Sequence, residues 1–277
     1  PGKIGDMAGH SKWANIKHRK GAADARKSKM FSKLAKYIMV AARNGGGNPQ
    51  ENLKLRYAIE KAKAESMPKD SIARAVKKGT GELQGEAIEE LTYEGIGPHG
   101  LSVIMEALTD NRNRTGGEMR NLLEKRGGSL GKSNSVMWKF DRKGLLSISK
   151  EDVEEEELFE EAIEAGAENI EEAGESFDVE VPAESFDQVR GALQSFLEKK
   201  RGIGEEKKWG ETEDDRPIFE RSELIYKPQN PVVIADKETA KAALNFLEDL
   251  EDHEDVQNLF SDLDVPEEII DSLAAED

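Results

Sequence analysis

The sequence predicts an α+β protein of two or three domains, and three observations support this prediction. Apolar residues recur at helical spacing through residues 30–79, without a strand pattern. After Gly79, short β-branched segments alternate with helical segments. From Gly144 the order becomes strand, helix, strand, strand, helix, strand, which is the order of a ferredoxin-like unit. A length of 277 residues is also more than one hydrophobic core normally supports.

The first of these domains, residues 7–81, is predicted to contain three helices. Apolar residues on one face of the first helix are Phe31, Leu34, Ile38 and Ala41. The Gly-rich segment 44–49 ends that helix, because glycine allows the left-handed conformation of a helix end. A second helix is expected over 49–65, and a third from Pro68, which suits a first helical turn.

Strands and helices then alternate to the C-terminus. Before Gly144 the predicted elements are strands 91–94 and 101–108, joined by the turn 95–100, then a helix over 117–126 and a strand over 135–140. The ferredoxin-like unit has predicted strands 145–148, 168–172, 177–181 and 223–227, with helices 151–165 and 183–200. The tail has an apolar segment 232–234, a helix 239–250 and a strand 255–260.

Charge is divided unevenly along the chain. Residues 1–81 carry 19 Lys and Arg against 6 Asp and Glu, whereas the remainder carries 21 against 51. The whole chain has a formal net charge of −17. Such asymmetry is typical of a basic module that binds nucleic acid, attached to an acidic body that repels phosphate.

The strongest candidate site is the basic segment 7–36, which contains one acidic residue, Asp24. Cations neutralise phosphates, and an aromatic ring among them offers a face to a base. The predicted phosphate contacts are Lys12, Lys17, Arg19, Lys20, Arg26, Lys27 and Lys29, with Lys33 and Lys36 extending the track. His18 is expected to add a pH-dependent contact. Trp13 either stacks on a base or anchors the core, and the alternative for the whole segment is a solvated, charged helix.

The positive surface is expected to continue beyond this segment. Its further members are Lys54, Arg56, Lys61, Lys63, Lys69, Arg74, Lys77 and Lys78. The loop 110–115, with Arg112 and Arg114, is a second candidate. As structure, it is a strand-to-helix turn in which Asn113 or Thr115 caps the helix. As a site, its arginines and amides would grip phosphate or an RNA edge, and both interpretations stay open.

The composition excludes several classes of protein. The chain has no Cys, so disulfides, thiolate metal sites and Cys nucleophiles are excluded. No apolar run approaches the ~18–20 residues of a bilayer-spanning helix. No signal-peptide pattern appears, and Met7 looks like a natural start after residues 1–6. We therefore expect a cytoplasmic protein that binds neither a membrane nor a small-molecule substrate.

Two motifs imitate nucleotide-binding loops. Residues 95–100 satisfy G-x-G-x-x-G, but a strand follows instead of the helix that would take the pyrophosphate. Residues 127–133 imitate a P-loop, but Arg126 replaces its first glycine. The histidines are scattered, and the acidic runs 154–157 and 251–255 are explained by solvated helix faces. The sequence thus predicts no cofactor, no metal and no catalytic residue.

Several motifs resemble those of the YebC family, also called the PmpR or translational-activator-of-cytochrome-oxidase family. The most specific are M-A-G-H-S-K-W-A-N-I-K-H-R-K from Met7 and A-L-T-D-N-R-N-R-T from Ala107, and D-V-Q-N-L-F-S-D from Asp255 extends the match to the tail. The resemblance implies a helical bundle, residues 7–81, followed by two α+β domains. It places the third domain, residues 143–227, as an insertion in the second, which comprises residues 82–142 and 228–277.

The resemblance also implies a regulatory activity without enzymatic chemistry. Some relatives are described as DNA-binding transcriptional regulators, and others act in translation on ribosomes stalled at proline runs. We interpret the chain as a nucleic-acid-binding regulator of gene expression, with promoter DNA as the leading target. The alternative is a ribosome-associated translation factor that binds ribosomal RNA. A third hypothesis is a scaffold whose acidic domains bind a protein partner.

Overall fold

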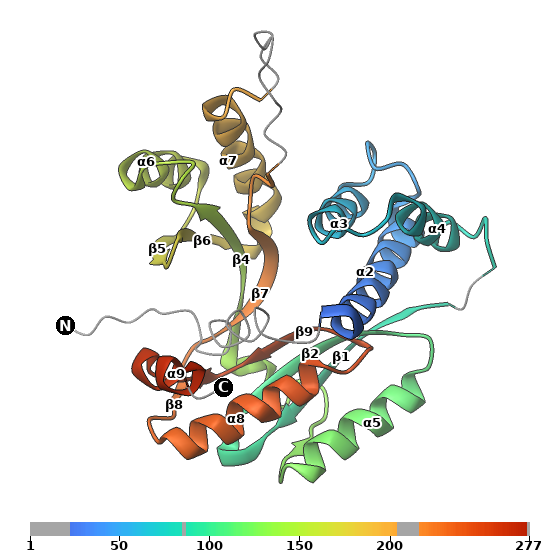
Figure 1. The fold of residues 1–277 in the computed structure, drawn as a ribbon, viewed down its shortest axis with the longest axis vertical. Coiled ribbons are helices and arrows are strands. Elements are labelled where there is room, and N and C mark those ends of the chain that lie inside the picture. The colour runs from blue at the N-terminus through green and yellow to red at the C-terminus, as the bar shows by residue number, and fades with distance from the viewer. Residues whose placement is uncertain (1–22, 85–86, 204–215, 276–277) are drawn as a thin grey trace. The chain divides into compact units, whose positions relative to one another are not determined.

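The computed structural model describes residues 23–84, 87–203 and 216–275, apart from the side chains of residues 23–26. Helices come first and a mixed region of helices and strands follows (Figure 1), which confirms the predicted fold class. The chain forms two compact units. One holds Phe140–Gln229, and the other holds the described residues on either side of it. A unit in the middle of the chain is what an inserted domain requires.

Three helices make up the N-terminal domain: α2 (Ala23–Gly45), α3 (Leu53–Ala64) and α4 (Lys69–Gly79). α2 begins at Ala23, before the apolar pattern that starts at residue 30, so part of the basic segment is helical. Asn52 caps α3, because its side-chain oxygen accepts the backbone N–H of Leu55 at 3.1 Å. The same side chain donates to the carbonyl oxygen of Ala41 in α2 at 2.8 Å, which joins the two helices.

Apolar residues on the facing surfaces of the helices hold this domain together. The buried ones are Leu34, Ile38, Ala41, Ala42, Leu55, Ala58, Ala62, Met67, Ile72 and Ala75. α4 lies so close to α2 that a Cβ at Gly79 would be 2.4 Å from the carbonyl oxygen of Met39. Burial of the apolar faces turns the charged faces of α3 and α4 outward.

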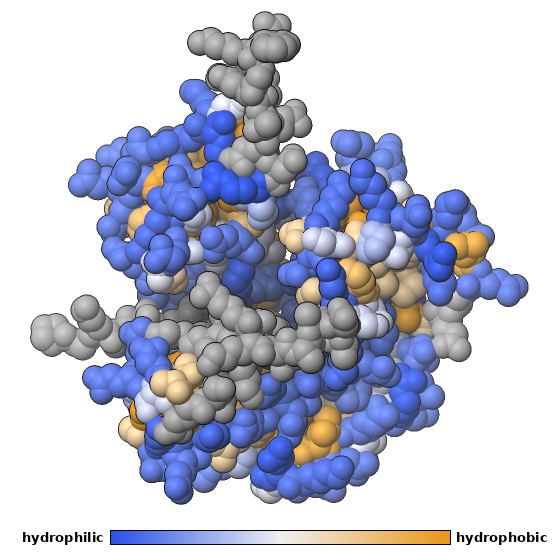
Figure 2. Space-filling view, viewed as in Figure 1, coloured by the Kyte–Doolittle hydropathy of each residue, from blue (hydrophilic) through white to orange (hydrophobic). Residues whose placement is uncertain are grey.

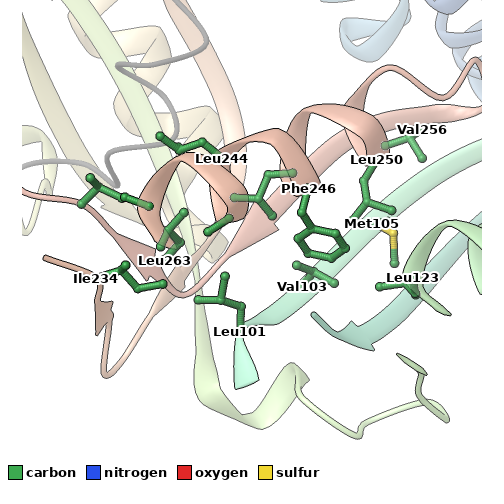
Figure 3. Close-up of a cluster of buried hydrophobic side chains, with 14 of the residues drawn as sticks. Leu101, Val103, Met105, Leu123, Ile234, Leu244, Phe246, Leu250, Val256 and Leu263 are labelled. Carbon is green, nitrogen blue, oxygen red and sulfur yellow. The ribbon is translucent and has the colours of Figure 1, made fainter. Parts of the chain in front are cut away.

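An antiparallel sheet in the order β3-β1-β2-β9 forms the second domain. Its strands are β1 (Glu89–Ile96), β2 (Ser102–Thr109), β3 (Ser129–Leu130) and β9 (Val256–Ser261). Helices α5 (Arg112–Lys125) and α8 (Lys237–Glu251) contribute to the core, together with β2 (Figure 3). A parallel pair, β8 (Val232–Val233) with β10 (Leu263–Asp264), and α9 (Glu267–Ala274) complete the domain. Because β9 pairs with β2, the sheet joins segments from both sides of the middle unit.

The predicted strand over residues 135–140 is wrong. Met137–Lys139 form the short 3-10 helix η2, and a strand begins only at Phe140. The reason is the buried carboxylate of Glu94, which accepts three backbone N–H groups from residues 134–137. Backbone donors that are bound to a side chain are not available for a strand ladder, so the segment wraps around Glu94.

The unit Phe140–Gln229 is a four-stranded antiparallel sheet with two helices. Its strands are β4 (Phe140–Ser149), β5 (Asn169–Ala173), β6 (Ser176–Pro182) and β7 (Arg221–Pro228), in the order β5-β6-β4-β7. Helices α6 (Glu155–Ala165) and α7 (Phe186–Lys200) share a buried core with the sheet, including Leu146, Val179, Leu158 and Leu193. Element order and strand pairing are those of the ferredoxin-like motif.

Candidate nucleic-acid interface

Exposed cations on α3 and α4 form the most accessible positive surface of the described helical domain. Six of them make no ion pair with any described residue: Lys54, Lys63, Lys69, Arg74, Lys77 and Lys78. Arg74, Lys77 and Lys78 are three and four residues apart and therefore lie on one side of α4. Ile72 and Ala75 are buried, which fixes the opposite side of the helix against the core.

The surface around this helical domain carries hydrophilic residues at its periphery and a smaller group of hydrophobic residues on the face in view (Figure 2). The exposed hydrophobic side chains of the domain and its C-terminal flank are Tyr37, Leu53 and Leu83. Among the described helices, none combines the length and the apolar character needed to cross a bilayer.

Much of the predicted basic segment lies outside the described residues. This applies to Lys12, Trp13, Lys17, His18, Arg19 and Lys20. Arg26 belongs to α2, but its side chain is also outside the described part. The nucleic-acid role of these seven residues stays a prediction.

Lys27 and Lys29, in the first turns of α2, are exposed. The Lys27 ammonium lies 5.8 Å from the centroid of the Phe31 ring, a weak cation–π contact at an exposed site. Lys29 donates to the carbonyl oxygen of Asp252 at 3.4 Å, and its ammonium is 3.9 Å from the Asp252 carboxylate. Both lysines keep most of their solvation and are open to a polyanion.

Lys33 and Lys36 are used within the chain. The Lys33 ammonium donates to the backbone carbonyl oxygen of Glu251 at 2.6 Å. Burial lowers the pKa of Lys33, against the opposing effect of Glu251 and Asp252. Lys36 donates to the Asp255 carboxylate at 2.5 Å and to the Glu254 carbonyl oxygen at 3.3 Å. A phosphate contact by either lysine would require these internal bonds to break.

Asp255 is the centre of this internal cluster, and its side chain has no exposed surface. Besides Lys36, it accepts Arg114 at 2.9 Å and the Thr115 hydroxyl at 2.7 Å. Burial alone would raise the pKa of Asp255, but the bonds from Lys36, Thr115 and Arg114 lower the pKa to about 2. One carboxylate thus joins α2, α5 and the start of β9.

Residues of the loop 110–115 take part in the same cluster around Asp255. Asn111 caps α5 by accepting the backbone N–H of Arg114 at 3.1 Å, so the predicted cap by Asn113 or Thr115 is wrong. The Thr115 hydroxyl is instead directed at Asp255, because Thr115 lies one turn inside the helix. Arg112 is exposed and lies 3.9 Å from Glu89, whereas Arg114 also pairs with Asp110 at 3.0 Å.

The acidic run 251–255 is therefore not the solvated helix face that the sequence predicts. Its first four residues have exposed or half-buried side chains, but its backbone carbonyls receive the α2 lysines and Asp255 is buried. A signal was present in the sequence: Asp255 directly precedes the apolar residue that begins β9. An acidic residue at the start of a strand is a candidate for burial near a cation. The sequence does not indicate which cations would pair with it.

Glu118, His253 and Asp255 bring three ligand atoms within 4.8 Å of one another. Each is already engaged in the chain. His253 Nδ1 accepts the backbone N–H of Asp255 at 3.1 Å, and Nε2 lies 2.9 Å from a Glu118 oxygen. Asp255 holds two cations and a hydroxyl, so these contacts explain the cluster without a metal ion.

Comparison with known proteins identifies the family. Residues 11–82 match the model of the TACO1/YebC N-terminal domain, and residues 88–208 and 211–263 match that of the TACO1/YebC second and third domain. Relatives named probable transcriptional regulatory protein include one from Dictyoglomus turgidum, 45% identical over 97% of this chain and 100% of its own. Another, from Desulfatibacillum aliphaticivorans, is 46% identical over 95% of this chain and 99% of its own.

A solved structure supports the same conclusion. The crystal structure of a conserved hypothetical protein from Aquifex aeolicus matches with a TM-score of 0.76 and 41% identity, over 92% of this chain and 98% of that one. The agreement extends over the helical domain and both α+β domains in sequence and in fold. The chain belongs to the TACO1/YebC family of regulatory proteins.

Proposed function

We propose that this protein is a non-enzymatic regulator of gene expression that binds nucleic acid through its N-terminal helical domain. The observation that carries the proposal is the exposed set of cations on α3 and α4 that have no ion pair with a described residue. Phosphate contacts by Lys and Arg release counterions and give an affinity independent of sequence. The acidic remainder of the chain repels phosphate over most of its surface, so the main contact is expected on the helical domain.

The proposed contact surface joins the predicted segment to these helices. It comprises Lys12, Lys17, Arg19, Lys20, Arg26, Lys27 and Lys29, followed by Arg74, Lys77 and Lys78 on α4. Trp13, His18 and Arg112 remain candidate contacts beside it. Lys33 and Arg114 are secondary candidates, because their charges are committed to internal acceptors.

Promoter DNA is the proposed target, in line with the names of the relatives as transcriptional regulatory proteins. The second candidate is ribosomal RNA, bound by a translation factor that relieves stalled elongation. It is favoured by one feature of the structure, the exposed Trp138, since an exposed ring suits an unpaired base better than a duplex.

The charge contribution of α4 can be tested with a matched pair of variants. Arg74→Ala/Lys77→Ala removes two exposed cations of the proposed surface, and Arg120→Ala/Lys199→Ala removes two exposed cations outside the helical domain. We expect the first variant to flatten the slope of log K against log salt by about one to two units, because two phosphate contacts are lost. The second variant should keep the slope. Equal slopes for both variants and the unmodified protein would place the contact surface elsewhere.

The target itself is distinguished by ultraviolet crosslinking in growing cells, followed by sequencing of the attached nucleic acid. Reads focused on a few promoters support the DNA target. Reads on large-subunit ribosomal RNA, weakened in Arg74→Ala/Lys77→Ala, support the ribosomal target. Reads no higher than background would contradict nucleic-acid binding and favour a scaffold that binds a protein partner.

A further inference from the structure

Trp138 is unusually exposed for a tryptophan. Its exposed fraction is 64%, the highest among the large hydrophobic side chains of the described residues. Tryptophan normally buries most of its large apolar ring. Packing within the chain therefore does not explain a tryptophan at this position.

The segment that carries Trp138 is held in one conformation by a buried carboxylate. Glu94 accepts the backbone N–H groups of Asn134, Val136 and Met137 at 2.5, 2.8 and 2.8 Å. Burial would raise the pKa of Glu94, but the backbone donors of residues 134–137 outweigh it and lower the pKa. The bonds are charge-assisted and therefore strong. The conformation of the loop is therefore fixed by contacts within the chain.

The orientation of the ring is also fixed. The indole N–H donates to the carbonyl oxygen of Ser135 at 3.1 Å, and the backbone N–H of Ser135 donates to the carbonyl oxygen of Lys132 at 3.1 Å. The Lys139 ammonium lies 5.9 Å from the ring centroid and donates to the Ser102 hydroxyl at 2.8 Å. The ring therefore lies beside the turn 132–135. Because the ring is already held in one orientation, binding of a partner costs little side-chain conformational entropy.

Close packing preserves this arrangement. A Cβ at Gly131 would lie 2.2 Å from the Ser135 hydroxyl and 3.2 Å from the carbonyl oxygen of Glu94, so a larger residue there would displace the Ser135 side chain. Lys132 is exposed and has no ion pair with a described residue. It lies on the same turn to which the indole is bonded.

The local charge differs from that of the surrounding acidic chain. Residues 125–139 contain four Lys and Arg and no acid, whereas residues 82–277 as a whole contain 21 cations and 51 acids. Arg126 and Lys139 pair with Asp249 and Asp262, and Lys125 and Lys132 have no ion pair with a described residue. An aromatic ring within a cationic stretch is the same combination that marks the basic segment 7–36. Neither an acidic protein surface nor a purely apolar one would account for both features as well as a nucleotide does.

We infer that Trp138 and Lys132 form a second nucleic-acid site, which binds an unpaired nucleotide of a single strand. The base stacks on the indole, and Lys132 contacts the adjacent phosphate. Bases within a duplex are stacked on each other and cannot lie on the ring, so the site selects single-stranded segments. This inference rests on the proposed binding of nucleic acid, and among the two candidate targets it favours ribosomal RNA, which offers unpaired nucleotides, over a promoter duplex.

Fluorescence of the full-length protein can test the site. In the Trp13→Phe/Trp209→Phe variant, Trp138 is the remaining tryptophan. We expect short oligouridylate or oligothymidylate to quench its emission, whereas a duplex of equal length leaves the emission unchanged. Comparison of the two single strands shows whether the sugar matters. Unchanged emission with both single strands at saturating binding would overturn the inference.

Affinity gives a second readout. Trp138→Ala should weaken binding of the single strand by about 5- to 150-fold, the range for loss of one base–aromatic stack, without changing the salt slope. Trp138→Phe should restore most of the affinity, and Lys132→Ala should flatten the slope by about 0.7. If Trp138→Ala binds as the unmodified protein does while Arg74→Ala/Lys77→Ala flattens the slope, the second site is wrong and the proposed function stands. If the unmodified protein binds no oligonucleotide, both are wrong.

Discussion

Two sets of cations in the helical domain have different environments. Lys33 and Lys36 of α2 are bonded to Glu251, Glu254 and Asp255 in the C-terminal part of the chain. Arg74, Lys77 and Lys78 of α4 have no ion pair with a described residue. Residues of the same type and the same domain therefore serve two purposes. The α2 lysines connect domains, and the α4 cations remain open to a partner.

The difference follows from what each helix packs against. α2 places Met39 and Val40 in a small apolar cluster with Ile88 and Leu108 of the second domain, which brings its lysines close to the turn after α8. Carbonyl oxygens at the end of α8 carry partial negative charge from the helix dipole and suit an ammonium. Arg74, Lys77 and Lys78 of α4 are exposed, so their charge remains solvated.

The largest expected effect comes from removing the centre of the α2 contact. Asp255→Asn should lower the free energy of unfolding by about 3 kcal/mol, because Lys36 and Arg114 then lose a buried counter-charge. Urea unfolding measures this change. Asp252→Asn is the matched control, since the Asp252 side chain is 67% exposed, and it should change stability by less than about 0.5 kcal/mol. Equal effects of the two variants would contradict the central role of Asp255.

A smaller effect is expected from acid. The pKa of Asp255 is about 2 in the folded chain, below its ordinary value of 3.8. A carboxylate with a lowered folded pKa stabilises the protein above its unfolded pKa, and this contribution is lost as the pH falls through the folded pKa. Between pH 5 and pH 2 the unmodified protein should therefore lose about 2 kcal/mol that Asp255→Asn does not lose. Urea unfolding at several pH values measures the difference, and parallel curves would show that Asp255 does not titrate as its contacts indicate.

Much of the fold could be predicted from the sequence because local patterns specify it. The helices and most strands follow from apolar spacing and turn residues, and the element order identifies the ferredoxin-like unit. The prediction of a strand over 135–140 was wrong because Glu94, some 40 residues earlier, binds the backbone N–H groups of this segment. The apolar pattern of the segment itself does not indicate that interaction. The prediction of the helix cap was wrong for a related reason. Asn111, Asn113 and Thr115 are all residue types that cap helices, and Asp255, far away in the sequence, binds the Thr115 hydroxyl.

The candidate site was less predictable than the fold. Charge along the sequence indicates a basic domain, but it cannot show which lysines have internal partners more than 200 residues away. Lys36 and Lys77 are indistinguishable by composition, although Asp255 binds the first and leaves the second free of described ion pairs. The exposure of Trp138 was equally hidden, because a lone Trp in an apolar segment normally predicts burial.

A pair of single substitutions sharpens the comparison most directly. Lys36→Met keeps much of the side-chain volume but removes the ammonium, so Asp255 loses one of its two cations. We expect the free energy of unfolding to fall by about 1.5 kcal/mol, the lower end of the range for a hydrogen bond to a charged group, with an unchanged salt slope for nucleic-acid binding. Lys77→Met should do the reverse: stability changes by less than about 0.5 kcal/mol, and the slope flattens by about one unit. Urea unfolding and salt-dependent binding measure the two quantities on the same samples. If Lys36→Met flattened the slope as Lys77→Met does, nucleic acid would compete with Asp255 for Lys36, and the internal contact would open when the protein binds.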